Sequence, residues 1–366
     1  MDNQLILEAL RNDIERSEKA AARQKAVWLK EKPDKHPLLL CCPLSGLDEP
    51  NTKETHYNSE KMLRSGLIGA MAAVRGGADA VPSIRANMGC GIFATLFGIK
   101  QELFDDKMPW VLEHLTKDDL YRMTAADLKI GEEFTAALEH IHYMADAVKG
   151  TACRIFPPDL QGAFDTAHIV YGDDIFYDLY DDPGFIHHLM DLSCHAIFMG
   201  MDAALEAMDI KDGLIPHYSS LVMPRSLGGV KISEDTSTLV SKEHINEFVL
   251  PYLDRILNYY GGGYIHYCGV NDALFDGLLS LEKVYGLNFG DPQKMDMPYH
   301  LSRIAGAGKL YFGHCGKMDG EGYEEYFRRV CGPATDDDGN LRLLLSISCR
   351  AEERDGIFDA WSKGHC

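Results

Sequence analysis

Residues 261–269 read Gly-Gly-Gly-Tyr-Ile-His-Tyr-Cys-Gly, a short apolar segment bounded by glycines that predicts a buried strand. Because side chains alternate between the two faces of a strand, His266 and Cys268 point to one face and Tyr267 to the other. A second predicted strand, much further along the chain, ends in Ser348-Cys349. One imidazole and two thiolates are ligands that zinc accepts, with a fourth tetrahedral position left for a substrate atom. The pattern predicts a catalytic zinc site made of His266, Cys268 and Cys349.

A simpler interpretation of the same residues stays open. The chain has ten cysteines, and in a protein of intracellular character most cysteines are small buried hydrophobic residues, while a His-x-Cys pattern also arises by chance. Cys315 competes with Cys349 for the third ligand position. Strand alternation places His314 and Cys315 on opposite faces, so at most one of them points inward.

Short apolar runs recur along the chain and are separated by stretches whose apolar residues have helical spacing. Eight of these runs are predicted strands: residues 80–84, 154–156, 213–216, 229–232, 264–267, 284–289, 309–312 and 343–347. Alternation of strand and helix indicates a parallel sheet, and eight strands favour a closed (β/α)8 TIM barrel over a doubly wound sheet. We therefore expect a single barrel domain over residues 1–366, in which residues 1–78 form an N-terminal helical extension. The connection at 219–228 resembles a loop and is the weakest part of this prediction.

Composition narrows the classes of partner. The chain has 366 residues, a hydrophobic fraction of 46% and a formal net charge of −20, so it can bury a sizeable core and is a poor partner for nucleic acid or for anionic membrane surfaces. The first ten residues lack the basic start and the continuous apolar run of a signal peptide, and no run of eighteen apolar residues occurs. We expect a cytoplasmic protein whose cysteines remain thiols. The amphipathic helix expected over residues 5–29 suits a packing or homodimer contact.

Polar residues follow the predicted strands, where the active site of a barrel lies. Glu234 or Asp235 is a candidate to complete the zinc site or to take the substrate proton, although adjacent acids after a strand often cap a helix. His217 is a second catalytic candidate, and a histidine satisfied by backbone is the simpler interpretation of it. Four further residues are candidates for binding the substrate, with structural roles as the alternative: Arg85, Asn87, Asp291 and His314.

The chain resembles the uroporphyrinogen decarboxylase superfamily, and within it the branch of cobamide-dependent methyltransferases that act on thiols such as coenzyme M. The resemblance covers most of the chain and lies in residues 158–164 (PDLQGAF), 177–183, 239–251 (LVSKEHINEFVLP) and in His266-Tyr267-Cys268 with Cys349. The last set is the specific one, because the methyltransferase branch is similar in having His-x-Cys and a distant Cys as zinc ligands. The resemblance implies a barrel, a Zn²⁺ cofactor and a methylcobamide cosubstrate.

Two departures refine what the resemblance implies. Residues 1–84 contain no Arg-Gln-Ala-Gly-Arg segment of the kind with which the decarboxylases grip porphyrinogen carboxylates. The chain also lacks the Asp-x-His-x-x-Gly segment that ligates cobalamin, because Tyr264 stands where the Asp would be. A corrinoid would then arrive on a separate partner protein.

The leading interpretation is a zinc-dependent methyltransferase that moves a methyl group between a corrinoid and a small-molecule donor or acceptor, with thiol methylation favoured. Three alternatives stay open. The first is a demethylating enzyme for a methoxylated compound or a methylamine, in which zinc acts on the departing heteroatom. The second is a metal-independent carboxy-lyase. The third is a non-catalytic barrel with a structural zinc, which would show four protein ligands and no open position.

Overall fold

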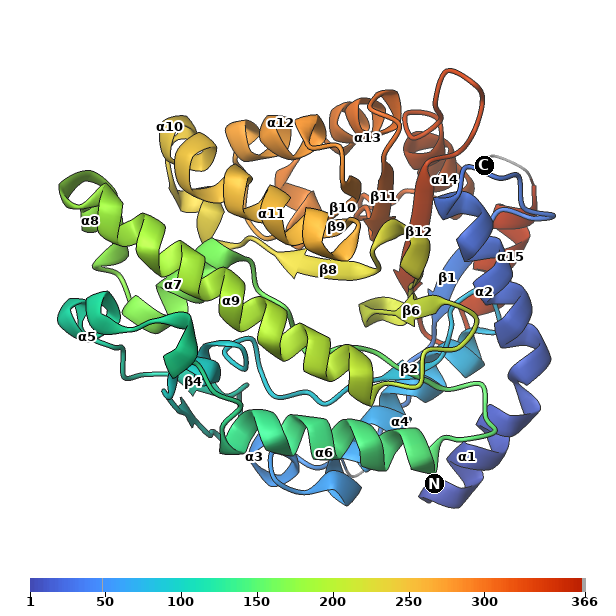
Figure 1. The fold of residues 1–366 in the computed structure, drawn as a ribbon. Coiled ribbons are helices and arrows are strands. Elements are labelled where there is room, and N and C mark those ends of the chain that lie inside the picture. The colour runs from blue at the N-terminus through green and yellow to red at the C-terminus, as the bar shows by residue number, and fades with distance from the viewer. Residues whose placement is uncertain (48, 364–366) are drawn as a thin grey trace.

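The centre of the fold is a parallel sheet of six strands. The computed structural model describes residues 1–47 and 49–363, and within them the strand order of this sheet is β1-β12-β11-β10-β9-β8. All five pairings are parallel, as expected when each strand returns through a helix (Figure 1). The six strands are β1 (Leu38–Cys41), β8 (Val230–Ser233), β9 (Gly263–Tyr267), β10 (Val284–Phe289), β11 (Leu310–Gly313) and β12 (Leu343–Ser348).

Two more strands form a separate parallel pair. Strands β2 (Ser83–Ile84) and β5 (Arg154–Ile155) pair with each other. The chain after β5 then reaches β8, where the Ser233 amide donates to the Leu160 carbonyl at 3.0 Å and the Gly162 amide to the Ser233 carbonyl at 2.7 Å. The result is a barrel-like α/β fold, although among the described residues the sheets do not pair into one closed ring.

Two sequence predictions need correction here. The strand expected at 213–216 exists as β6 (Leu214–Pro216) but pairs antiparallel with β7 (Val222–Pro224). Ser219 and Ser220 have positive φ angles and turn the chain back, so this hairpin stands apart from the parallel sheet. Conversely, residues 1–78 are not wholly helical, because Leu38–Cys41 is strand β1 and pairs with β12. The short β3 (Gln101–Glu102) and β4 (Trp110–Val111) form another antiparallel pair.

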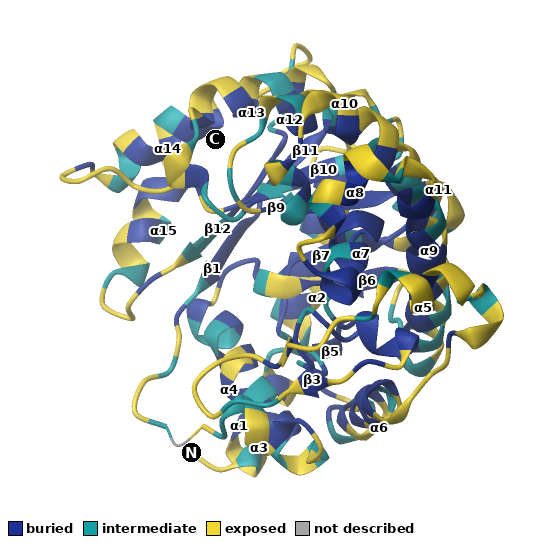
Figure 2. Cartoon of the chain, turned by 90° about the vertical axis from the view of Figure 1, so that its left-hand side faces the viewer, coloured by how far each residue is buried: buried dark blue, intermediate teal, exposed yellow. Residues whose placement is uncertain are grey.

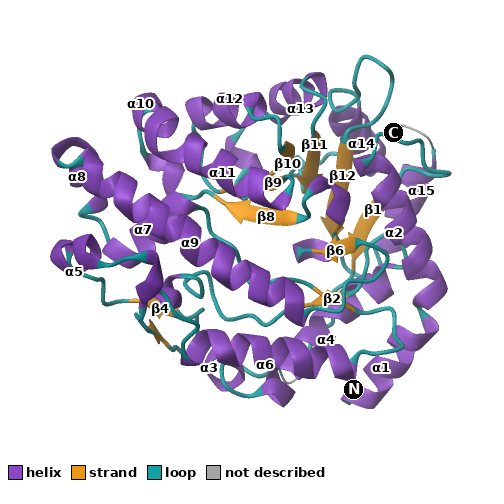
Figure 3. Cartoon of the chain, in the orientation of Figure 1, coloured by secondary structure: helices purple, strands orange, loops and turns teal. Residues whose placement is uncertain are grey.

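Helices surround the strands (Figure 3). The helices are α1 (Asn3–Asn12), α2 (Ile14–Trp28), α3 (Thr52–Thr55), α4 (Ser59–Gly76), α5 (Lys117–Arg122), α6 (Glu132–Ala147), α7 (Ala163–Tyr171), α8 (Ile175–Asp181), α9 (Pro183–Ala207), α10 (Lys242–His244), α11 (Leu250–Tyr260), α12 (Asp272–Ser280), α13 (Met297–Gly306), α14 (Tyr323–Cys331) and α15 (Arg354–Ser362). None of the described helices combines the length and apolar character needed to cross a membrane.

The sheet separates two apolar clusters, because strand residues alternate between its faces. Ile265 and Leu287 belong to the larger cluster, whereas Tyr264, Phe312 and Leu344 belong to a smaller one on the other face. Figure 2 shows buried strands inside a shell of helices whose outer sides are exposed. Since His266 lies two residues from Tyr264 on the same strand, it faces the side of the smaller cluster.

Candidate metal centre

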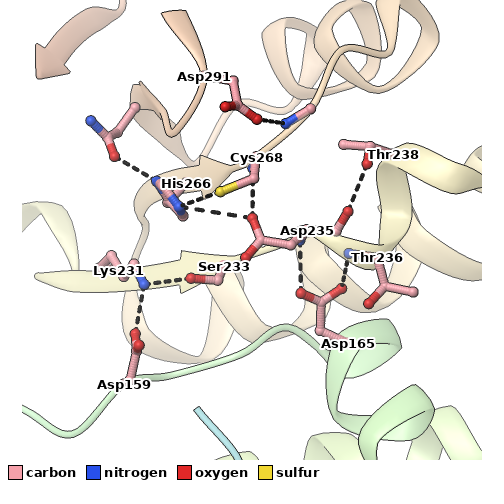
Figure 4. Close-up of polar contacts among 12 residues, drawn as sticks. Asp159, Asp165, Lys231, Ser233, Asp235, Thr236, Thr238, His266, Cys268 and Asp291 are labelled. Carbon is pink, nitrogen blue, oxygen red and sulfur yellow. Dashed lines mark hydrogen bonds and ion pairs between the residues drawn. The ribbon is translucent and has the colours of Figure 1, made fainter. Parts of the chain in front are cut away.

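Three side chains with metal-binding atoms meet just after β8 and at the end of β9. Ligand atoms of Asp235, His266 and Cys268 all lie within 4.8 Å of one another. The Nε2 atom of His266 is 3.6 Å from Sγ of Cys268 and 3.8 Å from Oδ1 of Asp235, and Figure 4 shows the three side chains converging. Among the described residues no other group of three or more His, Cys, Asp or Glu side chains is gathered in this way.

The imidazole of His266 is oriented by the neighbouring strand. Its Nδ1 is 2.6 Å from Oδ1 of Asn288, which is paired with it across β9 and β10. The amide nitrogen of Asn288 donates to the Phe312 carbonyl at 2.5 Å, so the amide oxygen faces the ring and accepts from Nδ1. The other nitrogen, Nε2, is thereby left with its lone pair toward Asp235 and Cys268, which is the tautomer that a metal ligand requires.

The loop after β8 is held by a buried carboxylate on α7. Asp165 is only 2% exposed and accepts from the Asp235 amide at 2.7 Å and from the Thr236 amide at 2.9 Å (Figure 4). The Asp235 carboxylate in turn accepts from the Cys268 amide at 2.6 Å. These bonds fix the backbone on which two of the three candidate ligands stand.

Glycine at position 290 makes room for the Cys268 thiol. A Cβ atom at this position would lie 2.3 Å from the Cys268 sulfur, which is far inside van der Waals contact. The next residue, Asp291, accepts from the Gly269 amide at 3.0 Å and from Lys294 at 3.2 Å. Asp291 therefore braces the turn after β9 in this structure, and no contact places it among the candidate ligands.

Burial and charge set the protonation of the site. Burial, followed by the nearby Lys231, lowers the pKa of His266, so the ring is neutral at neutral pH. Partial burial, together with Asp235, raises the pKa of Cys268 to about 11, so its thiol keeps its proton until a cation replaces it. This is the behaviour expected of a thiol that binds metal with release of a proton.

The predicted ligand Cys349 lies elsewhere. Its sulfur is 3.3 Å from the sulfur of Cys42, and its amide donates to the Cys41 carbonyl at 2.9 Å. Strand β12 is separated from β9 by β11 and β10, and Cys349 is not part of the gathered group. The structure therefore brings together two of the three predicted ligands and adds Asp235.

The predicted catalytic residue Glu234 is not among the gathered ligands. It is 1% exposed, accepts from the Ser237 hydroxyl at 2.7 Å, and packs so closely on Gly162 that a Cβ there would be 1.8 Å from its carboxylate. Burial, and next the charge of Asp165, raises the pKa of Glu234, and burial followed by Asp235 raises the pKa of Asp165 to about 7. Two carboxyl groups thus share a buried site next to the candidate metal centre.

The remaining predicted residues lie in two places. Arg85 donates to Asn87 at 3.0 Å and lies 3.6 Å from Asp159, and His217 lines the same pocket as Arg85. His314 is exposed, and its carbonyl accepts from the Tyr311 hydroxyl at 2.8 Å. The structure brings Arg85 and His217 together and leaves His314 outside the group of candidate ligands.

Sequence reasoning missed four polar residues of this region: Asn288, Asp165, Asp159 and Lys231. Lys231 donates to Asp159 at 2.7 Å and also to the Ser233 hydroxyl (Figure 4). A signal was available for two of them, because Lys231 and Asn288 are polar residues within otherwise apolar strands. Asp159 lies within the 158–164 motif and Asp165 directly follows it. Neither residue has sequence neighbours that indicate its role.

Comparison with known proteins bears on the fold. The sequence matches no protein-family model and no curated protein. The structure is similar to that of a methyltransferase from Methanosarcina mazei, with a TM-score of 0.65 and 15% sequence identity over 95% of this chain and 99% of that chain. At this identity the similarity shows a shared fold over nearly the whole of both chains.

Replacing Asn288 by alanine is expected to weaken zinc binding by about 10 to 100-fold, because His266 loses the acceptor that orients its ring. Competition with a chromophoric chelator measures the affinity. The exposed Asn258 on α11, whose side-chain amide donates to the Asp254 carbonyl of the same helix, gives the matched control Asn258→Ala. Equal affinity in the two variants would show that Asn288 does not support a metal ligand.

The buried carboxyl pair predicts a stability that falls as pH rises. Free carboxyl groups titrate near about pH 4, whereas the pKa of Asp165 in the folded chain is about 7. Between these two pH values the folded chain therefore holds more protons than the unfolded chain. Glu234→Gln is therefore expected to raise the free energy of unfolding by about 1 to 2 kcal/mol at pH 8 and by much less at pH 5. Urea unfolding at both pH values measures this. The exposed Glu8 provides the control Glu8→Gln, and a gain that does not depend on pH would contradict the explanation.

Proposed function

We propose that this protein is a zinc-dependent methyltransferase that transfers a methyl group from a corrinoid to a small thiol. The observation that carries the proposal is the cluster of Asp235, His266 and Cys268 at the carboxyl ends of β8 and β9. Parallel α/β folds place their active sites at this end of the strands. We take the parallel strands as a (β/α)8 barrel and the cluster as part of its mouth.

The donor set fits zinc. Imidazole nitrogen, thiolate sulfur and carboxylate oxygen are its usual protein ligands, and Nε2 of His266 has the free lone pair that ligation needs. Three protein ligands leave a fourth position for substrate, as in catalytic sites. When bound, zinc lowers the pKa of a coordinated thiol and so supplies a thiolate nucleophile at neutral pH.

The chain's own residues then have separate tasks. His266, Cys268 and Asp235 hold the ion, Asn288 orients the imidazole, and Asp165 fixes the loop that carries Asp235. The corrinoid is a cosubstrate that a separate partner protein brings, since the sequence has no cobalamin-ligating segment. Two anionic ligands, Asp235 and Cys268, neutralise the dication, which favours presenting a thiolate over strong activation of an ether oxygen.

The direct test is methyl transfer from methylcobalamin to a panel of two- and three-carbon thiols. We expect the visible spectrum of methylcobalamin to change to that of the demethylated corrinoid, and a methyl thioether to appear in equal amount, only with zinc-loaded protein. Zinc-loaded protein that demethylates a methoxylated compound in the presence of reduced corrinoid, and ignores thiols, would reverse the proposed direction. A protein that binds no zinc and decarboxylates aromatic acids would be the carboxy-lyase instead.

A further inference from the structure

Two cysteines lie side by side where two neighbouring strands of the central sheet end. Cys42 directly follows β1 and Cys349 directly follows β12 (Figure 1). Their sulfur atoms are 3.3 Å apart, and both residues are free thiols. Neither belongs to the gathered group of metal-binding side chains, so the candidate metal centre does not explain the pair.

The backbone holds the two cysteines opposite each other. Cys41 and Ser348 are register partners in β1 and β12, and the Cys349 amide donates to the Cys41 carbonyl at 2.9 Å. The Cys42 amide donates to the Ala72 carbonyl of α4 at 2.8 Å. Neighbouring strands lie about 4.8 Å apart, which is within the range of about 4.4 to 6.8 Å between Cα atoms that a disulfide spans. The sulfurs can therefore reach bonding distance by rotation of the side chains alone.

The adjacent thiol of Cys41 faces the other way. Because side chains alternate along a strand, Cys41 packs against the smaller apolar cluster, whereas Cys42 and Cys349 belong to the larger one. The Cys41 sulfur lies 3.8 Å from the Ser220 hydroxyl. Cys41 is therefore a neighbouring thiol that does not compete with Cys42 for Cys349.

Burial keeps the pair reduced unless an oxidant is present. Cys42 is 1% exposed and Cys349 is 8% exposed, so a small oxidant meets Cys349 first. Burial, followed by the hydrogen bond with Cys42, raises the pKa of Cys349 to about 12. Since the thiolate is the reactive form of cysteine, the pair reacts slowly at neutral pH and faster as the pH rises.

We propose that Cys42 and Cys349 are a redox-sensitive pair that forms a disulfide between the ends of β1 and β12 when hydrogen peroxide is present. The Cys349 thiolate attacks one peroxide oxygen and the O–O bond breaks, which gives a sulfenic acid on Cys349 and one water. The Cys42 sulfur then attacks the Cys349 sulfur, the S–O bond breaks and a second water leaves. Two thiols are oxidised to one disulfide, one peroxide is reduced to two waters, and the two thiol protons end in those waters. The inference does not rest on the proposed function, because neither cysteine is a candidate ligand.

The disulfide would cross-link the edge of the central sheet. Among the described residues β1 is the end strand of this sheet, and its partner there is β12. The two cysteines are 307 positions apart, so the bond closes a loop that contains most of the chain. A cross-link over a long loop restricts the unfolded chain strongly. The oxidised protein should therefore resist unfolding better than the reduced protein.

The test treats the full wild-type chain with hydrogen peroxide at pH 8 in EDTA, blocks the remaining thiols and digests the protein with trypsin. Cleavage after lysine and arginine places Cys42 in peptide 36–53 and Cys349 in peptide 343–350. We expect mass spectrometry to find these peptides joined until dithiothreitol is added, and fragmentation between Cys41 and Cys42 to assign the bond to Cys42. At the urea concentration that unfolds half of the reduced protein, the unfolding equilibrium constant of the oxidised protein should be at least about tenfold lower.

Cys41→Ala is the matched control and should keep both the joined peptides and the added stability, whereas Cys42→Ala should lose both. Separate peptides after a peroxide treatment that oxidises the exposed Cys268 would overturn the proposal, and so would a bond that uses Cys41. Joined peptides without added stability would overturn the role of the bond in holding β1. If Cys42→Ala does not fold, the wild type decides the point, through the fragmentation of its joined peptides and its return to the reduced unfolding curve in dithiothreitol.

Discussion

Cys268→Ala is expected to bind almost no zinc, against about one zinc per chain in the wild type, and to lose methyl transfer by at least about 100-fold. The reason is that Cys268 supplies the only thiolate of the gathered cluster among the described residues, and the remaining imidazole and carboxylate form a weak site for this metal. Elemental analysis of the dialysed protein and the methylcobalamin assay measure the two effects.

The matched control is Cys153→Ala. Cys153 is a fully buried cysteine immediately before β5, and its side chain belongs to the apolar core. This variant should keep its zinc and its activity and lose only some stability. Full zinc occupancy in Cys268→Ala would show that Cys268 is not a ligand, whatever happens to activity.

Asp235→Asn is expected to weaken zinc binding, whereas Cys349→Ala is expected to leave it almost unchanged. Asp235 lies in the cluster, 3.8 Å from Nε2 of His266, so the amide should lower zinc affinity by about 100-fold because it loses the charge that helps neutralise the dication. Cys349 contacts Cys42 instead, so its removal should leave zinc affinity within about threefold of wild type. Chelator competition at one fixed pH measures both.

The reverse result for these two variants would identify a different ligand set. If Cys349→Ala loses zinc and Asp235→Asn keeps it, the ligands are the His266, Cys268 and Cys349 set that the family resemblance implies. The carboxyl end of β12 would then have to move toward β9 when the metal binds. Cys42→Ala separates the two cases further, because it removes the neighbour of Cys349 without touching the cluster and should leave zinc unchanged.

Much of the fold could be predicted from the sequence, because strands buried by helices appear as apolar runs bounded by glycine or polar residues. Five of the six strands of the central sheet, from β8 to β12, overlap the predicted runs. Strand β1 was missed because four residues between two helical segments give no periodicity. The 213–216 run was assigned to the wrong partner because pairing depends on the turn after it, which Ser219 and Ser220 make with positive φ angles.

The candidate site could be predicted only where neighbours in sequence are neighbours in space. His266 and Cys268 meet because they are two residues apart on one strand. The sequence could not show whether Glu234 or Asp235 joins the cluster. That depends on tertiary packing, because Glu234 packs against Gly162 on another segment. The place of Cys349 depends on the spacing of strands across the sheet. Lys231 and Asn288 gain their roles from partners on other segments.

We propose that Asp235, His266 and Cys268 form a zinc centre that presents a thiol. X-ray absorption at the zinc edge, with and without an active thiol, tests this most directly. The account predicts one sulfur neighbour of zinc at about 2.3 Å in the free protein and two with the thiol bound. A spectrum with four protein ligands that does not change when any thiol is added would identify a structural zinc and contradict the account.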